Sequence, residues 1–429
     1  MKVMATILAY TSPSAGHLFP MLALLGELAG RGHRVHVRTY AGGVPAARAA
    51  GLTADAVDPR IEDIVSEDWR ATGGRAVLRM TIETFGGRGA HELDDLDDAI
   101  ALVGPDLLLL DINCWGAMAA ADAGDILWAV FSPYTPFLNS PGMPPVGAGM
   151  APWPGFVGRV RDAGVRAVVQ QVFDVPMMAN VNGFRAKRGL PALRDVDAVL
   201  RRAPLMLVAG GEPFEYPHPG WGAAVQMIGP CEYDPKPAAA PSWLDGIDRP
   251  VVLVTTSSVK QADSALVTTA LTALADKDIH IVATCPSGIP GGITVPRNAT
   301  VTGFLPHGPV LDRAVCAITH GGMGVTQKAL SRGVPVCAVP HGRDQFEVAR
   351  RVQAARCGTR LPARRLTPQR LRTAVERALT MTAGARRVAA GFAATGGVAR
   401  GADLLEQRLI GRSATRSARL EPEVTRRSS

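Results

Sequence analysis

The most informative stretch of the 429-residue sequence is ITHGGMGVTQKAL, residues 318–330. An apolar run ends at His320, three glycines follow within four positions, and a helical pattern begins near Met323. Glycines permit a tight turn and a close approach of backbone N–H groups to a ligand, and a helix N-terminus carries partial positive charge. The stretch therefore predicts a strand, turn and helix that can hold a phosphate, with His320 and Thr326 as further donors. Taken alone, it is also compatible with an ordinary glycine-rich turn.

The residues that follow extend this prediction into a second strand. The sequence GVPVCAVPHGRDQ, residues 333–345, indicates a strand ending at Pro340, and Asp344 and Gln345 come soon after it. Because the carboxyl ends of parallel strands meet at one edge of a sheet, both side chains should lie near the glycine turn. A carboxylate beside an amide can bond several sugar hydroxyls, although Asp344 is also a favoured helix N-cap. A Walker motif and a G-x-G-x-x-G fingerprint are both absent.

Short apolar runs alternate with helical patterns along both halves of the chain. Strands are predicted at 3–9, 34–39, 106–110, 126–131, 251–255, 279–283, 299–302, 315–319 and 334–339, and the last helix at 384–408. This alternation is typical of parallel βαβ units, so we expect an α/β protein with two doubly wound domains. The N-terminal domain should occupy residues 1–210 and the C-terminal domain residues 250–410. Proline-rich residues 211–249 are expected to link them.

Length and composition agree with two globular domains. A chain of 429 residues is too long for one ordinary core, and 47% of its residues are hydrophobic and 20% charged. Part of the net charge of +8 comes from five arginines within residues 411–429, which hold almost nothing apolar and should form a disordered basic tail. The charge therefore does not indicate a nucleic-acid partner. It leaves open a weak peripheral contact with an anionic membrane.

Cysteine usage and hydropathy favour a cytoplasmic location. The six cysteines are scattered without a CxxC pair, which is typical of reduced, buried thiols. The N-terminal sequence MKVMATILAY indicates a first strand and not a signal peptide, and no apolar run approaches the roughly 18 residues of a membrane span. The acidic residues of 94–98 recur on an amphipathic helix pattern, so a solvated helix face is expected there and not a metal site.

The run from His320 to Gln345 resembles the donor-site signature of family 1 glycosyltransferases, the UDP-glycosyltransferase-like enzymes. The resemblance is to the bacterial branch that glycosylates macrolides and other natural products. It implies the GT-B fold, with two facing Rossmann-like domains built on parallel sheets. It also implies a nucleotide-diphosphate sugar as donor substrate, and neither a metal nor another cofactor.

The resemblance assigns donor contacts to four short segments. The diphosphate would be held by His320, Gly321, Gly322, Gly324 and Thr326, and from the other side by Ser257 and Ser258. Asp344 and Gln345 would contact the hydroxyls of the donor sugar. Phe304 would pack on the nucleotide base, and Leu305 would offer its backbone to the edge of the base.

Two positions depart from the family pattern. Val325 stands where relatives have Ser or Thr, which removes one hydroxyl from the phosphate site. Lys328 stands where many relatives have a Glu that binds the ribose, and a lysine cannot accept hydrogen bonds from a ribose diol. The donor can therefore be a dTDP-sugar as well as a UDP-sugar.

In the first half, His17 and Asp111 match the family's catalytic pair. The Gly16–His17 dipeptide and Pro20 follow the first strand, and Asp111 ends the strand of the sequence PDLLLLD. The resemblance implies that His17 deprotonates the acceptor hydroxyl and that Asp111 orients it. From the residues alone, a capping histidine and an N-cap aspartate remain open.

The acceptor is expected to be apolar. Residues 132–160 are rich in proline and glycine, and a loop of this length is typical of a lid or binding element, although a surface excursion is equally compatible. Apolar side chains within about residues 137–178 that can face an acceptor are Phe137, Met143, Met150, Trp153, Phe156, Phe173, Met177 and Met178. The same side chains are equally compatible with an ordinary core.

These features predict an inverting hexosyltransferase of natural-product or antibiotic biosynthesis. It would move a hexose or deoxyhexose to a hydroxyl of a lipophilic small molecule, such as a polyketide, macrolide, aromatic compound or lipid. Two alternatives stay open: a non-catalytic nucleotide-sugar-binding activator of a partner glycosyltransferase, and a GT-B sugar-nucleotide epimerase. A homodimer also stays open.

Overall fold

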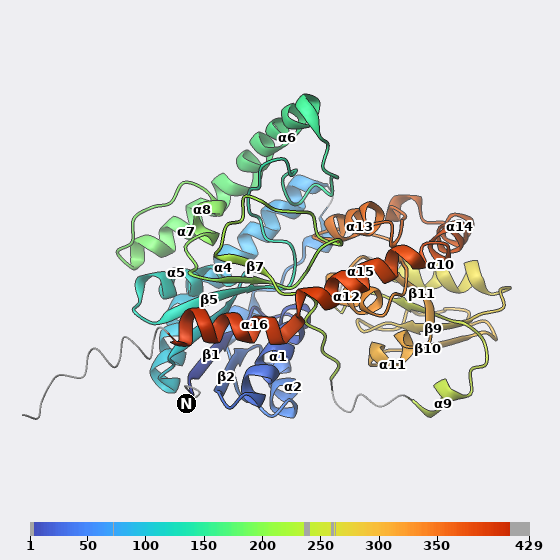
Figure 1. Cartoon of the computed structure of the whole chain (residues 1–429), viewed down its shortest axis with the longest axis horizontal. Helices are drawn as coiled ribbons and strands as arrows, with labels where there is room; N and C mark the ends of the chain where they lie inside the picture. Colours follow the sequence, from blue (N-terminus) through green and yellow to red (C-terminus); the bar gives the residue numbers. More distant parts are fainter. Residues whose placement is uncertain (1–3, 72, 236–240, 259–260, 262, 412–429) are drawn as a thin grey trace, which may run out of the picture.

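The computed structural model describes residues 4–71, 73–235, 241–258, 261 and 263–411. Apart from Gly411, the tail predicted at 411–429 lies outside the described residues. The chain forms two α/β lobes, which lie side by side in Figure 1. The first lobe is built on a seven-stranded sheet and the second on a six-stranded sheet.

The first sheet has the strand order β3-β2-β1-β4-β5-β6-β7, and all its pairings are parallel. Its strands are β1 (Thr6–Tyr10), β2 (Arg34–Thr39), β3 (Thr53–Ala56), β4 (Leu107–Asp111), β5 (Leu127–Ser132), β6 (Met206–Val208) and β7 (Val225–Met227). Its helices are α1 (Ala15–Gly30), α2 (Val44–Ala49), α3 (Pro59–Asp63), α4 (Gly74–Val103), α5 (Trp115–Ala123), α6 (Gly155–Val169), α7 (Val175–Lys187) and α8 (Val196–Leu200).

The second sheet has the order β10-β9-β8-β11-β12-β13 and is also parallel. Its strands are β8 (Val251–Thr255), β9 (His280–Thr284), β10 (Ala299–Thr302), β11 (Ala314–Thr319), β12 (Val336–Ala338) and β13 (Gly358–Arg360). The helices of this part of the chain are α9 (Ser242–Asp245), α10 (Ser264–Leu274), α11 (His307–Leu311), α12 (Met323–Ser331), α13 (Gln345–Ala354), α14 (Pro368–Leu379), α15 (Thr382–Thr395) and α16 (Gly397–Leu405).

The central strands of both sheets are continuous apolar runs. Every residue of β1, β4 and β8 is buried, as expected for strands covered by helices on both faces. In the first sheet the strand order reverses between β1 and β4, and in the second between β8 and β11. Ligands of doubly wound sheets bind beyond the carboxyl ends of the strands at such reversals. The predicted fold of two parallel-sheet domains is therefore confirmed. The reversals mark the carboxyl edge of each sheet as the place where a ligand would bind.

Two segments differ from the sequence prediction. β7 lies within residues 211–249, where an irregular linker is expected, and it forms the edge strand of the first sheet. The helix predicted at 384–408 is divided into α15 and α16, because Gly396 and Gly397 adopt positive φ angles of 98° and 62°.

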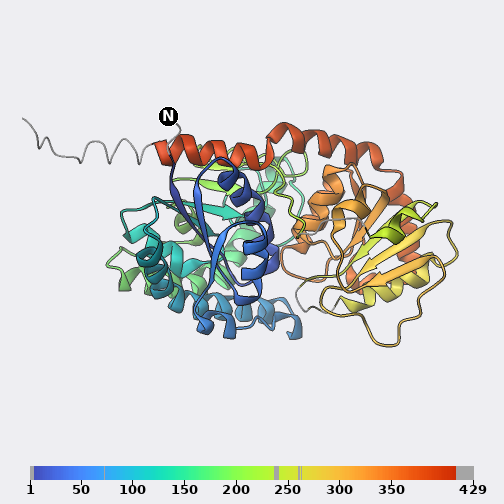
Figure 2. The ribbon, with the colours of Figure 1, turned by 90° about the horizontal axis from the view of Figure 1, so that it is seen from below.

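The last helices connect the two lobes. Figure 2 shows α15 and α16 running across both of them. α16 packs on α1, and Leu404, Leu405 and Leu409 belong to the apolar core of the first lobe. Leu404, Leu405 and Leu409 thus complete the apolar core around the first helix of the chain. The pattern of residues 384–408 does not reveal this contact.

The acidic residues of 94–98 lie on α4 and only partly match the predicted solvated face. Asp94, Asp97 and Asp98 are exposed, but Asp95 is 3% exposed. The Asp95 carboxylate accepts hydrogen bonds from Tyr10 Oη at 2.7 Å and from the Arg38 guanidinium at 2.5 Å. The prediction is therefore wrong for Asp95, which takes part in a buried structural contact.

Two further findings concern metals and membranes. Among the described residues, no cluster of histidine, cysteine or acidic side chains has the arrangement of a metal site. In the same part of the chain, no helix is long and apolar enough to cross a membrane.

Candidate active site

The carboxyl edge of the first sheet brings His17 and Asp111 together. His17 lies in the first turn of α1, directly after β1, and Asp111 is the last residue of the neighbouring strand β4. The distance from His17 Nδ1 to Asp111 Oδ2 is 2.7 Å, and Asp111 is fully buried. The backbone N–H of Asn113 donates to the other carboxylate oxygen of Asp111 at 2.8 Å. The carboxylate is therefore fixed in position to accept the Nδ1 proton of His17.

Two side chains that the sequence did not single out orient the other nitrogen of His17. Asn113 Nδ2 lies 3.3 Å from His17 Nε2, and Tyr134 Oη donates to Asn113 Oδ1 at 2.6 Å. Because the bond to Tyr134 fixes the Asn113 carbonyl, the Asn113 amide group donates to Nε2. This leaves the Nε2 lone pair of His17 as the acceptor, the tautomer that a general base needs.

Charge on both sides of His17 stabilises its protonated form. Burial disfavours the imidazolium, but the carboxylates of Asp111 and, more weakly, Asp344 outweigh it and raise the pKa of His17. Asp344 belongs to the second lobe, at the N-terminus of α13. Its own pKa is raised because burial outweighs the favourable charges of His17 and Arg343. The site thus joins a histidine of the first lobe to a carboxylate of the second.

The glycine turn of the second lobe follows β11 as predicted from its sequence. Gly321 has a φ of 87°, and a Cβ placed on Gly322 would lie 2.4 Å from Nε2 of His320. Only glycine therefore allows the imidazole to fold over the turn. α12 begins at Met323 with Gly322 as N-cap and no side-chain cap, so its first N–H groups are available to an anion.

His320 has the opposite electrostatic setting to His17. Burial, together with the positive charge of nearby basic groups, lowers the pKa of His320 to about 4. Its Nδ1 atom is buried and has no hydrogen-bond partner among the described residues, and the same holds for Oγ1 of Thr326. A neutral imidazole and a hydroxyl thus stand beside the helix N-terminus as hydrogen-bonding groups.

Asp344 and Gln345 lie at the start of α13, directly after a loop that is bound to both lobes. The Gln345 side chain accepts the backbone N–H groups of His341 and Gly342 at 2.8 and 3.1 Å, and donates to Gln261 at 2.7 Å. Arg343, with a φ of 55°, donates two hydrogen bonds to the Asp68 carboxylate of the first lobe at 2.7 and 2.5 Å. Gln345 therefore shapes the loop, and Arg343 joins the loop to the first lobe.

The remaining predicted donor contacts border the same edge of the second sheet. Ser257 is buried in the turn after β8, where its N–H donates to Asp263 at 2.7 Å, and Ser258 is exposed. Phe304 follows β10 and is 56% exposed, so its ring is free to stack on a planar group. Leu305 packs against the core of the second lobe.

Lys328 is engaged by a carboxylate that the sequence prediction missed. Its Nζ donates to Asp234 Oδ1 at 2.5 Å and also to the carbonyl of Tyr233. Asp234 Oδ2 accepts the N–H of Gly308, at the start of α11, at 3.1 Å. An acidic group therefore stands next to Lys328, although it comes from a segment nearly a hundred residues earlier, and no local pattern indicates it.

Comparison with known proteins supports the same interpretation of both lobes. Residues 268–399 match the family described as "Erythromycin biosynthesis protein CIII-like, C-terminal domain". The chain is 29% identical to 4'-demethylrebeccamycin synthase of Lentzea aerocolonigenes over 423 residues, which cover 94% of this chain and 99% of that protein. It is 25% identical to demethyllactenocin mycarosyltransferase of Streptomyces fradiae, over 94% of this chain and 86% of the relative.

Solved structures share the fold over nearly the whole chain. The glycosyltransferase of kitacinnamycin is similar with a TM-score of 0.73 and 24% identity, covering 95% of this chain and 99% of that one. The glycosyltransferase VinC in complex with dTDP is similar with a TM-score of 0.68 and 20% identity, covering 96% of this chain and all of that one. These neighbours have the GT-B fold.

Proposed function

The chain is a glycosyltransferase of the GT-B fold with an EryCIII-like C-terminal domain, and we propose that it works by inversion with His17 as general base. The donor would be a dTDP- or UDP-hexose or deoxyhexose bound by residues 250–410. The acceptor would be an apolar natural product carrying a hydroxyl, bound by residues 1–210. The observation that carries the proposal is the 2.7 Å contact between His17 and a fully buried Asp111 at the strand-order reversal of the first sheet.

In the proposed reaction, the acceptor hydroxyl replaces the Asn113 amide at Nε2 of His17 and gives its proton to this atom while its oxygen attacks the anomeric carbon. The bond between that carbon and the diphosphate oxygen breaks at the same time, so the sugar inverts and the nucleoside diphosphate leaves. Asp111 accepts the Nδ1 proton and stabilises the imidazolium that forms. The N–H groups at the start of α12, with His320 and Thr326, would receive the charge of the departing diphosphate. Asp344 would bind a hydroxyl of the donor sugar.

The choice of nucleotide is part of the proposal. The structure of VinC, which has the same fold, is a complex with dTDP. Lys328 cannot accept a hydrogen bond from a ribose diol, and it engages Asp234, whose carboxylate can accept one from a single sugar hydroxyl. We therefore favour dTDP-sugars over UDP-sugars, with Phe304 stacking on the base.

An aromatic path supports an apolar acceptor. The ring centroids of His17 and Tyr134 are 5.8 Å apart, those of Tyr134 and Phe137 6.2 Å, and those of Phe137 and Phe173 5.2 Å. Phe137 and Phe173 line a cavity of about 100 Å³, whose other walls include polar side chains such as Arg166, Asp174 and Asp197. The ring contacts connect the proposed base to this cavity, so the apolar body of the acceptor would lie beside the rings and its polar groups near the cavity. The names of the relatives, which refer to demethylrebeccamycin and demethyllactenocin, agree with such acceptors.

The test combines binding with turnover. dTDP, UDP and GDP are added to the protein and its thermal stability is measured, and dTDP-glucose or UDP-glucose is then incubated with 4-methylumbelliferone, an indolocarbazole aglycone and a macrolactone. We expect dTDP to stabilise the fold most and a glycoside to form that requires His17. If no nucleoside diphosphate raises the melting temperature, the donor site is wrong.

The same experiment separates the alternatives. A non-catalytic activator would bind nucleotide and keep its effect on a partner enzyme after His17→Ala, whereas the proposed transferase would bind nucleotide and lose turnover. An epimerase would convert the donor sugar without any acceptor. We also propose a cytoplasmic location, because all six cysteines are buried free thiols. A homodimer and a peripheral membrane contact stay predictions.

A further inference from the structure

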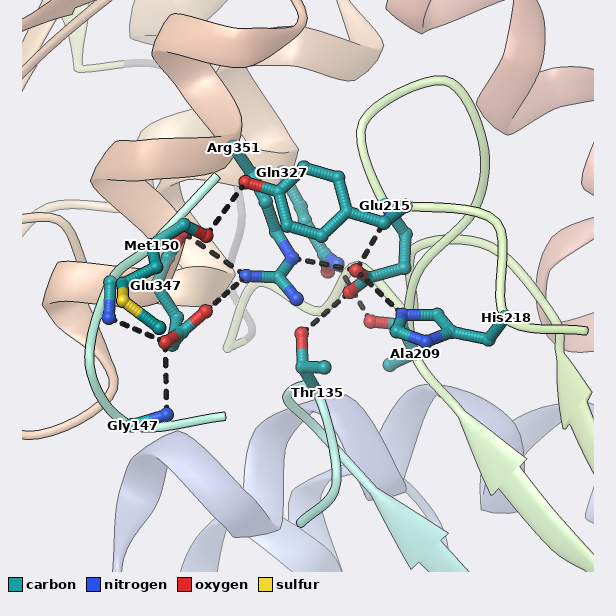
Figure 3. Close-up of polar contacts among 11 residues, drawn as sticks. Thr135, Gly147, Met150, Ala209, Glu215, His218, Gln327, Glu347 and Arg351 are labelled. Atoms are coloured by element: carbon teal, nitrogen blue, oxygen red, sulfur yellow. Dashed lines mark hydrogen bonds and ion pairs between the residues drawn. The ribbon is translucent and has the colours of Figure 1, made fainter. Parts of the chain in front are cut away.

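The segment after β5 leaves the first lobe and contacts α13 of the second. Figure 3 shows this contact, with Gly147 and Met150 beside Glu347. The Glu347 carboxylate accepts the backbone N–H groups of Gly147 and Gly149 at 2.9 and 2.6 Å. Arg350 donates to the carbonyl of Gly149 at 3.0 Å. One turn of α13 thus binds two N–H groups and one carbonyl of the backbone at Gly147–Gly149.

Gly149 is adapted to this close contact. Its φ is 59°, and a Cβ at this position would lie 2.8 Å from the backbone and Cβ of Phe346 on α13. A side chain at this position would clash with α13 and would strain this left-handed backbone, which glycine adopts readily. Gly149 therefore permits the close contact between this segment of the first lobe and α13 of the second.

A buried arginine extends the contact to the core of the molecule. Arg351 is 1% exposed and lies between Glu347 Oε2 at 2.6 Å and Glu215 Oε1 at 2.7 Å (Figure 3). Its guanidinium also stacks over the ring of Tyr216 at 4.5 Å. The other oxygen of Glu215 accepts a hydrogen bond from Thr135 Oγ1 at 2.5 Å. The network therefore fixes both ends of the segment, at Thr135 and at Gly147–Gly149.

Arg351 and neighbouring hydrogen-bond donors stabilise the negative charge of Glu215. Burial alone would raise the pKa of Glu215, but Arg351, with hydrogen bonds from His218 and Thr135, lowers it to about 2. Arg351 also pairs with Glu347, and the N–H groups of Gly147 and Gly149 complete the hydrogen bonding of the Glu347 carboxylate. Charged hydrogen bonds in a dry interior are among the strongest that a protein makes.

The two ends of this network lead to the two substrates of the proposed reaction. Tyr134 and Phe137, on the segment, border His17 and the proposed acceptor path. Asp344, at the N-terminus of α13, is the proposed contact of the donor sugar and lies three residues before Glu347. We propose that Glu347 and Arg350 are positioning residues, which hold the acceptor segment at a fixed place relative to the donor sugar, and that Arg351 keeps Glu347 in place. This inference rests on the proposed function.

The contact between the segment and α13 would affect sugar transfer and not donor binding. If the segment shifts, the acceptor hydroxyl moves away from the anomeric carbon, while the donor keeps its contacts with the second lobe. Water can then compete for the sugar. A loosened segment should therefore raise the share of donor that is hydrolysed, whereas simple loss of folded protein lowers hydrolysis and transfer together.

The test uses two variants and one matched control in the full chain. Glu347→Gln removes the charge that binds Gly147 and Gly149 and pairs with Arg351, but leaves the Arg351–Glu215 pair. Arg350→Ala removes the bond to the Gly149 carbonyl, together with an exposed bond to Gln353, and disturbs no buried ion pair. Arg372→Ala is the control, because Arg372 also donates to a backbone carbonyl, that of Ala273 at 2.8 Å, but entirely within the second lobe.

Transfer from dTDP-glucose to 4-methylumbelliferone, the indolocarbazole aglycone or the macrolactone, whichever the wild type accepts, is measured together with donor hydrolysis. We expect the acceptor KM to rise about tenfold in Glu347→Gln, the effect of one weakened charged hydrogen bond, and less in Arg350→Ala. Donor KM and hydrolysis should stay at wild-type values, and Arg372→Ala should change nothing. Hydrogen exchange at residues 147–150 should quicken in both variants.

Two results would overturn the inference: an acceptor KM unchanged in both variants, or transfer and hydrolysis falling in the same proportion. Failure of the proposed function is recognised separately. A wild-type protein that transfers sugar to none of the acceptors contradicts that proposal before any substitution is made.

Discussion

His17 and His320 lie at the strand-order reversals of the two sheets, and their surroundings shift their pKa values in opposite directions. Each follows a central strand at the point where the strand order reverses. His17 contacts a buried carboxylate, which raises its pKa, whereas burial and nearby positive charge lower the pKa of His320 to about 4. In the proposed reaction the same residue type would accept a proton in one lobe and would be a hydrogen-bonding group that stays neutral near pH 7 in the other.

The comparison explains how one site can handle two different charges. In the proposed reaction the first lobe removes a proton from a hydroxyl, and a carboxylate beside the histidine would favour that step. The second lobe has to receive a diphosphate, for which it offers helix N–H groups and a neutral imidazole. Substitutions at each histidine and its neighbours test these two roles.

The largest effect is expected for His17→Ala. Without a base, transfer should fall by about a thousandfold, within the range that general base catalysis contributes, while dTDP binding stays unchanged. Single-turnover transfer and thermal shift with dTDP measure the two quantities. A variant that retains most of its transfer activity would show that another group removes the proton.

The next largest effect is expected for Asp111→Asn. An amide can no longer stabilise the imidazolium, so kcat should fall by about a hundredfold. The pH profile should also change. In the wild type the rate rises with pH as His17 loses its proton, at a pKa above the ordinary 6.5. In the variant, burial acts without its counter-charge, so this rise should move to lower pH. If the rate increases at the same pH in the variant and in the wild type, the proposed role of Asp111 is contradicted.

His320→Ala should have a smaller effect, confined to the donor. Loss of one hydrogen bond to the departing diphosphate should lower kcat by about ten- to a hundredfold. Because the pKa of His320 is about 4, its removal should leave the pH profile between pH 5 and 8 unaltered. A changed profile in that range would show that His320 carries a proton during turnover.

The smallest effect is expected for Val325→Thr, which tests the diphosphate site of the second lobe. The substitution restores a hydroxyl at the start of α12, where relatives have Ser or Thr. Affinity for dTDP should rise about threefold, the contribution of one added neutral hydrogen bond. Isothermal titration of the variant and the wild type measures it. Equal affinities would show that position 325 does not face the diphosphate.

The sequence predicts the parts of this molecule that depend on local pattern. Buried strands appear as apolar runs, and the turn at Gly321 and Gly322 appears in the spacing of glycines. The positions of His17 and Asp111 follow from the strands that precede them, since those strands are neighbours in the sheet.

The parts that depend on distant contacts could not be predicted. Asp234 reaches Lys328, Asp68 reaches Arg343, and Glu347 reaches the segment at Gly147 and Gly149, each across a large distance in sequence. Asn113 lies two residues after Asp111, but its role depends on Tyr134 of another strand end. Such pairs carry no periodic signal, because each residue alone is compatible with an ordinary loop.

The central claim is that the two histidines of one site differ in protonation, and a single NMR titration tests it directly. Imidazole resonances of the ¹³C-labelled chain are followed from pH 4 to 9, with His17 and His320 assigned from the spectra of the His17→Ala and His320→Ala variants. We expect His17 to titrate above its ordinary value of 6.5 and His320 to remain neutral down to about pH 4. A His17 that titrates below 6.5, or a His320 that titrates beside it, would contradict the account.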